Sequence, residues 1–222
     1  MTGLGSSPIT GEYDRGRLLA RAQHDYNAQV AIAHGWAETL TRMWDSFDDA
    51  ERRGAVARIE QAIGRIDRLA TGVFAEARAD ELARTVSAAP LDARIVVDPT
   101  GHRDRRVRSL PDRPVPVLAD RTVLGMLIDD LVAAQQAGAP PDTITELAVE
   151  TTGDRVELVV RTPGGQPSPP IDADDPLGHS SHPTAVLRLL ASRVLADAIG
   201  AELIVCHDGA AAVATVQLAR VP

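Results

Sequence analysis

A histidine followed directly by an aspartate, His24-Asp25, forms the pair whose chemistry is easiest to specify in this sequence. Helical spacing places the neighbouring Tyr26 and Val30 on one apolar seam, so His24 is expected to point away from that seam into solvent. An exposed imidazole can act as a nucleophile near neutral pH, because one ring nitrogen is a free base while the other is held by a hydrogen bond. Asp25 is the candidate for that orienting role. An ordinary surface histidine is the alternative interpretation.

The elements that must present this pair are two consecutive helices. Apolar residues recur at spacings of three and four from about residue 16 to residue 47, and again from residue 56 to residue 73. Between them, Asp48 and Glu51 have the spacing of a capping box, which marks the start of the second helix. The first seam comprises Leu19, Tyr26, Val30, Ala33, Ala37, Leu40, Trp44 and Phe47, and the second Val56, Ile59, Ile63, Ile66, Ala70 and Val73. The sequence therefore predicts a helical hairpin.

Two helices alone cannot enclose a core, because each seam needs apolar neighbours on more than one side. Two copies of the hairpin can form a four-helix bundle, which predicts a homodimer. A hairpin packed only on the rest of its own chain is the alternative.

The pattern changes near Ser87–Pro90, where the helical periodicity stops. Short apolar runs follow, which favour strands over residues 93–97, 115–118, 144–150, 155–161, 203–206 and 212–218. Residues 120–136 and 184–199 have helical spacing, and residues 163–183 form a long loop rich in Gly, Pro, Ser and Asp. This is an α+β arrangement with one sheet covered by helices on one face. The predicted organisation is a flexible N-terminus (1–15), a hairpin (16–86) and an α/β sandwich domain (91–222).

Composition excludes several functions. The net charge of -8 disfavours nucleic-acid binding, and the basic run His102–Arg108 is expected to be a solvated loop or strand. The single cysteine, Cys206, cannot form an internal disulfide, and no apolar run approaches the roughly 18 residues of a membrane span. We expect a cytoplasmic protein with no membrane contact. The remaining polar residues could form either a metal site or a polar surface loop, and we prefer the loop. They are His179, His182, Asp172, Asp174, Asp175, Cys206 and His207.

The stretch from His24 to Leu40 resembles the H-box of bacterial two-component histidine kinases. That pattern has a His, an acidic residue, an apolar residue, a Gly eleven positions after the His, and then an aromatic-Ala-Glu ending. The matching residues are His24, Asp25, Tyr26, Gly35, Trp36, Ala37, Glu38 and Leu40. The resemblance implies that His24 is phosphorylated and that Asp25 is its acidic partner. Ala28 stands where the family usually has a water-positioning Thr or Asn, which puts phosphatase activity of the usual kind in doubt.

The later segment resembles the family's ATPase domain in outline, over residues 115–121, 127–132, 140–143 and 198–205. Its nucleotide-binding positions are altered. Ala134 replaces the Mg²⁺-binding Asn, with Asp130 one turn earlier, and Arg161 replaces the adenine-binding Asp. Of two expected glycines only Gly165 is kept, and Pro183–Arg188 replaces a second Gly-rich motif without any glycine. An Ala cannot ligate Mg²⁺, and an Arg cannot accept the adenine amino hydrogen.

These features predict a histidine phosphotransferase that moves a phosphoryl group between the aspartates of response-regulator receiver domains through His24. No cofactor is expected in the protein itself. ATP would not be used, and the receiver would supply Mg²⁺. A non-enzymatic pseudokinase that binds a response regulator or a kinase is the second hypothesis. An active ATP-dependent kinase with a divergent site is the third.

Overall fold

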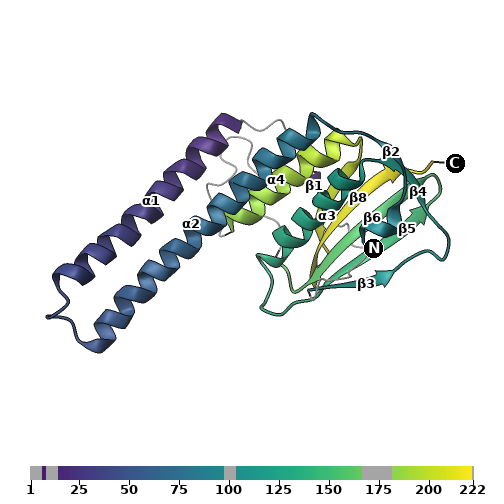
Figure 1. The fold of residues 1–222 in the computed structure, drawn as a ribbon. Helices are drawn as coiled ribbons and strands as arrows, with labels where there is room; N and C mark the ends of the chain where they lie inside the picture. The colour runs from purple at the N-terminus through teal and green to yellow at the C-terminus, as the bar shows by residue number, and fades with distance from the viewer. Residues whose placement is uncertain (1–6, 9–14, 98–103, 167–181, 222) are drawn as a thin grey trace.

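The computed structural model shows two long helices that lead into an α/β domain (Figure 1). It describes residues 7–8, 15–97, 104–166 and 182–221. Helix α1 spans Arg15–Arg42 and helix α2 spans Asp49–Ala83. The two lie side by side and form the predicted hairpin.

The turn of the hairpin is fixed by the capping box. The Asp48 carboxylate accepts hydrogen bonds from the backbone amides of Ala50 and Glu51, both at 2.8 Å, and the Glu51 carboxylate accepts one from the Asp48 amide at 2.9 Å. The prediction that the first helix continues to Phe47 is wrong, because α1 ends at Arg42. The guanidinium of Arg52 donates to the Trp44 carbonyl oxygen at 2.8 and 3.1 Å, and so holds these residues in the turn.

The central element of the domain is a six-stranded sheet in the order β1-β7-β8-β6-β5-β3. Its pairs are antiparallel except β3 with β5. A separate two-stranded sheet joins β2 to β4. The prediction of one sheet is therefore wrong, because the described residues form two. The strands are β1 Ser7–Pro8, β2 Ala89–Asp92, β3 Arg105–Ser109, β4 Pro116–Ala119, β5 Thr145–Thr152, β6 Arg155–Pro163, β7 Glu202–His207 and β8 Ala211–Ala219.

Helices α3 (Arg121–Gln136) and α4 (Pro183–Ala198) cover one face of the sheet (Figure 1). The helices cover this face because it is apolar. In strand β6, for example, the alternate residues Val156, Leu158 and Val160 are fully buried. The resulting core contains large side chains of α3, α4 and the central strands. The predicted fold, a helical hairpin followed by an α/β sandwich, is confirmed.

Residues 93–97, expected to form a strand, instead begin with a 3₁₀ helix over Ala93–Val96. The cause is Asp92, whose carboxylate accepts hydrogen bonds from the backbone amides of Arg94 at 3.1 Å and Val115 at 3.0 Å. An aspartate that caps in this way favours a helical turn over an extended chain. The Arg94 side chain returns to the same carboxylate, with Nη2 2.7 Å from Oδ2.

This capping aspartate gives the protein an acid-sensitive contact. The hydrogen bond from Arg94, aided by the backbone amides, lowers the pKa of Asp92 from 3.8 to about 2. A carboxyl group whose pKa is lower in the native state contributes stability above pH 3.8, and this contribution is lost as the pH falls from about 4 to about 2. We expect Asp92→Asn to be less stable than the wild type at pH 7. Between pH 4 and pH 2 the variant should lose less stability than the wild type does. Urea unfolding at several pH values measures this, and an equally steep acid loss in the variant would contradict it.

The hairpin joins the domain through direct contact between α2 and α4. The side chains of Leu18, Ala22, Val186, Leu187 and Leu190 form a buried cluster between hairpin and domain. Gly72 of α2 lies so close to α4 that a Cβ there would stand 2.7 Å from Leu187 Cδ1 and 2.9 Å from Leu187 Cβ. The absence of a side chain at Gly72 is therefore what allows the two helices to pack at this distance.

We expect Gly72→Ala to destabilise the protein by about 1–3 kcal/mol, because the added methyl group must push α4 away from α2. Gly54→Ala, on the same helix, is the matched control. A Cβ at Gly54 meets nothing within 4 Å, so that variant should gain up to about 1 kcal/mol from its better helix propensity. Urea titrations of both variants check the opposite signs, and equal effects would contradict the close α2–α4 packing.

Candidate functional site

The structure places His24 on the exposed surface of α1. Its side chain is 72% exposed, and its Nδ1 lies 3.3 Å from Asp25 Oδ1. Arg21, one turn earlier, brings its Nε to 3.6 Å from the same oxygen. When Nδ1 carries the proton, the imidazole donates a hydrogen bond to Asp25, and the lone pair of Nε2 faces away from that contact. The arrangement is suited to nucleophilic attack by Nε2.

The two residues about one turn after His24 on its side of the helix are Asn27 and Ala28. Ala28, one turn after His24, is half-buried and presents only a methyl group. Asn27, three residues after His24, is exposed and lies on the same broad face of the helix. A second histidine, His34, is also exposed on α1.

Asp130, the oxygen donor one turn before the expected Mg²⁺ position Ala134, is held in an ion pair. Asp130 of α3 is 4% exposed, and its Oδ1 lies 2.5 Å from Nη1 of Arg188 on α4. Its Oδ2 is buried without a hydrogen-bond partner in the described part of the chain. Burial raises the pKa of Asp130, and Arg188 opposes this effect. Ala134, buried one turn later, adds no oxygen, so these residues do not fit a Mg²⁺ ion.

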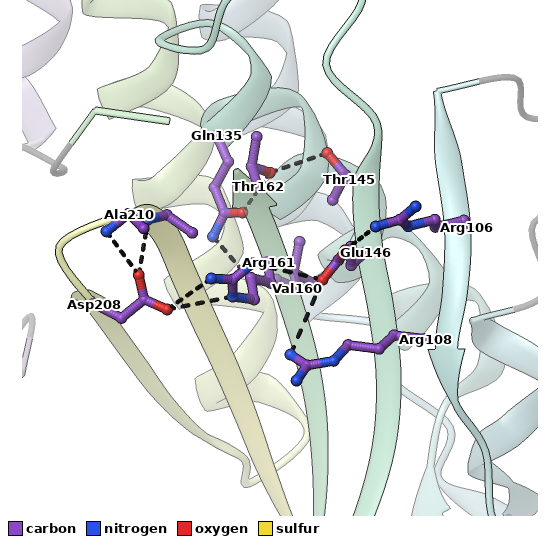
Figure 2. A network of polar contacts seen from close by, with 11 residues as sticks. Arg106, Arg108, Gln135, Thr145, Glu146, Val160, Arg161, Thr162, Asp208 and Ala210 are labelled. Atoms are coloured by element: carbon purple, nitrogen blue, oxygen red, sulfur yellow. Dashed lines mark hydrogen bonds and ion pairs between the residues drawn. The ribbon is translucent and has the colours of Figure 1, made fainter. Parts of the chain in front are cut away.

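The position expected to read adenine belongs to a second charged network, drawn in Figure 2. Arg161 of β6 contacts Asp208 Oδ2 through Nη2 at 3.0 Å and Nε at 3.3 Å, and Glu146 Oε2 through Nη1 at 3.6 Å. Glu146 also pairs with Arg106, and more distantly with Arg108 at 4.0 Å. The hydrogen bond from Arg106 is the main cause that lowers the pKa of Glu146. Arg161 therefore pairs with two carboxylates, and its guanidinium has no acceptor of its own to offer an adenine amino group.

Beside this network lies a chain of buried polar side chains (Figure 2). The Thr162 hydroxyl donates to Gln135 Oε1 at 2.8 Å, the Gln135 amide donates to the Val160 carbonyl oxygen at 3.2 Å, and Thr145 Oγ1 is 3.0 Å from Thr162 Oγ1. These side chains satisfy one another between α3, β5 and β6. Sequence reasoning missed them. The signal that could have found them is the polar Thr162 on the otherwise apolar face of β6.

Gly165, the glycine kept at the first Gly-rich motif, lies in a tight turn after β6. A Cβ there would stand 3.0 Å from both Ala212 Cβ and the Thr162 carbonyl oxygen. Its own carbonyl oxygen lies 3.0 Å from His207 Nε2, and its amide donates to Thr162 at 3.1 Å. The preceding Gly164 has a φ of +66°, which favours glycine. Gly164 and Gly165 therefore fit a tight turn against β8.

Two other features concern the chain as a whole. Within the described ranges, no three His, Cys, Asp or Glu side chains gather as metal ligands; His179 and the aspartates of 172–175 lie outside those ranges. None of the described helices combines the length and the apolar character needed to cross a membrane.

Comparison with known proteins relates this architecture to histidine kinases. No protein-family model matches the sequence, and no curated protein matches it. Among solved structures, the chain is similar to the Acinetobacter baumannii histidine kinase AdeS, with 13% identity, a TM-score of 0.54 and coverage of 88% of this chain and 97% of that one. It is also similar to the histidine kinase ThkA in its complex with the response regulator TrrA, with 17% identity, a TM-score of 0.63 and coverage of 93% and 62%.

At these identities the likeness concerns the fold, and it extends over the hairpin and the domain together. The chain therefore has the fold of histidine kinases, a helical hairpin followed by an α/β domain similar to their ATPase domain.

Proposed function

We propose that this protein is a histidine phosphotransferase of a two-component phosphorelay, which passes phosphoryl groups between receiver aspartates through His24 and does not use ATP. The observation that carries the proposal is the contrast between two sites. His24 is exposed with its Nδ1 beside Asp25, while Asp130 and Arg161, at the nucleotide positions, are held in ion pairs.

The proposed step is a displacement at phosphorus. Nε2 of His24 attacks the aspartyl phosphate of one receiver, the bond from phosphorus to the aspartate oxygen breaks, and that aspartate leaves as a carboxylate. The same step in reverse delivers the phosphoryl group to the aspartate of a second receiver. Asp25 holds the Nδ1 proton in place and stabilises the positive charge that develops on the ring. Mg²⁺ would come with the receiver.

Receiver domains as partners are supported by the relative ThkA, whose structure was solved in complex with a response regulator protein. In this chain, the docking surface would be the part of the hairpin around His24. No nucleic acid and no membrane is part of the proposal.

The hairpin also carries the surface needed for a homodimer. Several large apolar side chains of the two helices and their turn stay more than a third exposed in the single chain. They are Leu19, Tyr26, Val30, Ile32, Trp44, Val56, Ile63 and Phe74. Most of them belong to the seams that predict the hairpin, and pairing two hairpins into a four-helix bundle would cover them. Light scattering coupled to size-exclusion chromatography measures the resulting mass.

The experiment that tests the proposal supplies the phosphoryl group in two forms. The purified chain is incubated with a ³²P-labelled phosphorylated receiver, and separately with labelled ATP and Mg²⁺. We expect label on the chain only in the first case, and transfer of that label to a second, unlabelled receiver. Label on His24 from ATP alone would establish the working-kinase hypothesis instead.

A non-enzymatic pseudokinase is the second candidate, and the occupied nucleotide positions favour it equally. His24 separates the two. A pseudokinase that acts by binding would keep its affinity for the receiver and its effect on output after His24→Ala, whereas a phosphotransferase would keep the affinity and lose the output.

A further inference from the structure

A cavity of about 610 Å³ lies between the hairpin and the ATPase-like domain. Its hairpin wall comes from the middle of α1 and α2, and its domain wall from the end of α3 and the start of α4. The lining residues are Asp25, Gln29, Gln61, Arg65, Arg68, Leu69, Ala137, His182, Pro183 and Thr184. A volume of this size is typical of small-molecule sites.

The charges of the lining point to an anionic ligand. Arg65 and Arg68 lie one turn apart on α2, and neither forms an ion pair with any residue that the structure describes. Two neighbouring cations without a counter-ion repel each other, and a bound anion would relieve that repulsion. Asp25, the one carboxylate of the lining, is already in contact with Arg21 and His24.

The remaining polar groups suit oxygen-rich ligands. Gln29, Gln61 and Thr184 can donate hydrogen bonds to phosphate oxygens. Helix α4 begins in the cavity wall at Pro183, and its N-cap residue His182 gives it no side-chain cap. The positive end of the helix therefore adds to the field of the two arginines.

The cavity lies apart from the positions aligned with Mg²⁺ and adenine, although Pro183 and Thr184 of its lining belong to the segment that replaces the second Gly-rich motif. Its lining does not include Asp130, Ala134, Arg161 or Gly165. Asp130 and Arg161 are held in ion pairs elsewhere. A ligand of this cavity would be recognised by its negative charge and its oxygens, without an adenine contact.

We propose that this cavity binds a small polyanion of the phosphate class, such as a pyrophosphate or a phosphorylated metabolite, with Arg65 and Arg68 as its main ligands. The ligand contacts both walls and so holds the hairpin against the domain beside Asp25, the neighbour of the candidate nucleophile. This binding does not depend on phosphoryl transfer through His24, so either proposal can fail without the other.

Isothermal titration calorimetry of the full chain with sodium pyrophosphate tests the site. We expect saturable binding that weakens with added salt, and a dissociation constant raised roughly tenfold or more in the double variant Arg65→Gln, Arg68→Gln. Both side chains are on an exposed part of α2, and circular dichroism verifies that the variant is folded.

The double variant Arg53→Gln, Arg113→Gln is the matched control, since both arginines are exposed and outside the cavity lining and the net charge changes by the same amount. It should bind pyrophosphate as the wild type does. Three results would overturn the proposal: no binding of pyrophosphate by the wild type, equal weakening in both double variants, or binding of adenosine, which carries no phosphate.

Discussion

Replacing His24 with Gln is expected to abolish phosphoryl acceptance, with a fall in transfer rate of roughly 10³-fold or more, because the amide that takes the place of the imidazole is not a nucleophile. The side chain is 72% exposed and its one contact is with the neighbouring Asp25. The fold and the affinity for a receiver should therefore stay unchanged. Rapid-quench measurement of label transfer from a phosphorylated receiver gives the rate.

The same helix offers a matched control for this variant. His34 is exposed on α1 ten residues later, and His34→Gln should transfer at the wild-type rate. Label that remains on His24→Gln, or that disappears equally in His34→Gln, would show that the acceptor lies elsewhere. Calorimetric titration with the unphosphorylated receiver verifies that both variants still bind it.

The second large effect is expected at the buried ion pair between Asp130 and Arg188. Arg188→Ala should destabilise the protein by about 3 kcal/mol at pH 7, because it leaves the buried carboxylate of Asp130 without its cation. We expect the lower end of the range for broken buried pairs, because the Arg188 side chain keeps 21% of its surface exposed. Urea unfolding measures the loss.

This variant should also respond to pH in a defined direction. Burial raises the native pKa of Asp130 above 3.8, so the native state binds more protons than the unfolded state between these two pKa values. Its contribution to stability is complete below pH 3.8 and is lost as the pH rises through the native pKa. Removing Arg188 raises that native pKa further. The deficit of Arg188→Ala should therefore shrink as the pH is lowered from 7 toward 4.

A paired replacement provides the control for both statements. The double variant Asp130→Leu, Arg188→Met removes the two charges together and leaves no unpaired carboxylate, so it should cost much less than Arg188→Ala. The role of this pair would be contradicted if Arg188→Ala were as stable as the wild type, or if the double variant were less stable than Arg188→Ala.

The sequence predicted the elements of the fold well where the signals are local. The capping box at Asp48 and Glu51 is a contact between residues three apart, and it marked the start of α2 correctly. The apolar, β-branched composition of residues 93–97 favours a strand, whereas their conformation is set by Asp92, which caps the Arg94 amide two residues on and also binds the Val115 amide 23 residues away. Periodicity carries no information about such a contact.

The candidate site was predictable to a similar extent. The loss of nucleotide contacts at Ala134 and Arg161 stays a prediction, and the sequence did not indicate which side chains pair near these positions. The pairs join distant segments: Asp130 and Arg188 are 58 residues apart, and Arg161 and Asp208 are 47 apart. The cavity at Arg65 and Arg68 is likewise formed by two faces that meet only after folding.

Helix α2 has a mechanical consequence for the whole molecule. Its 35 residues form one uninterrupted rod of about 50 Å, which begins at the hairpin turn and reaches the domain, where Gly72 lies against Leu187. No hinge separates the part of the rod beside His24 from the part in contact with α4. A partner docked around His24 would lie close to the contact between hairpin and domain, so a tilt of α2 at that place would be passed directly to α4.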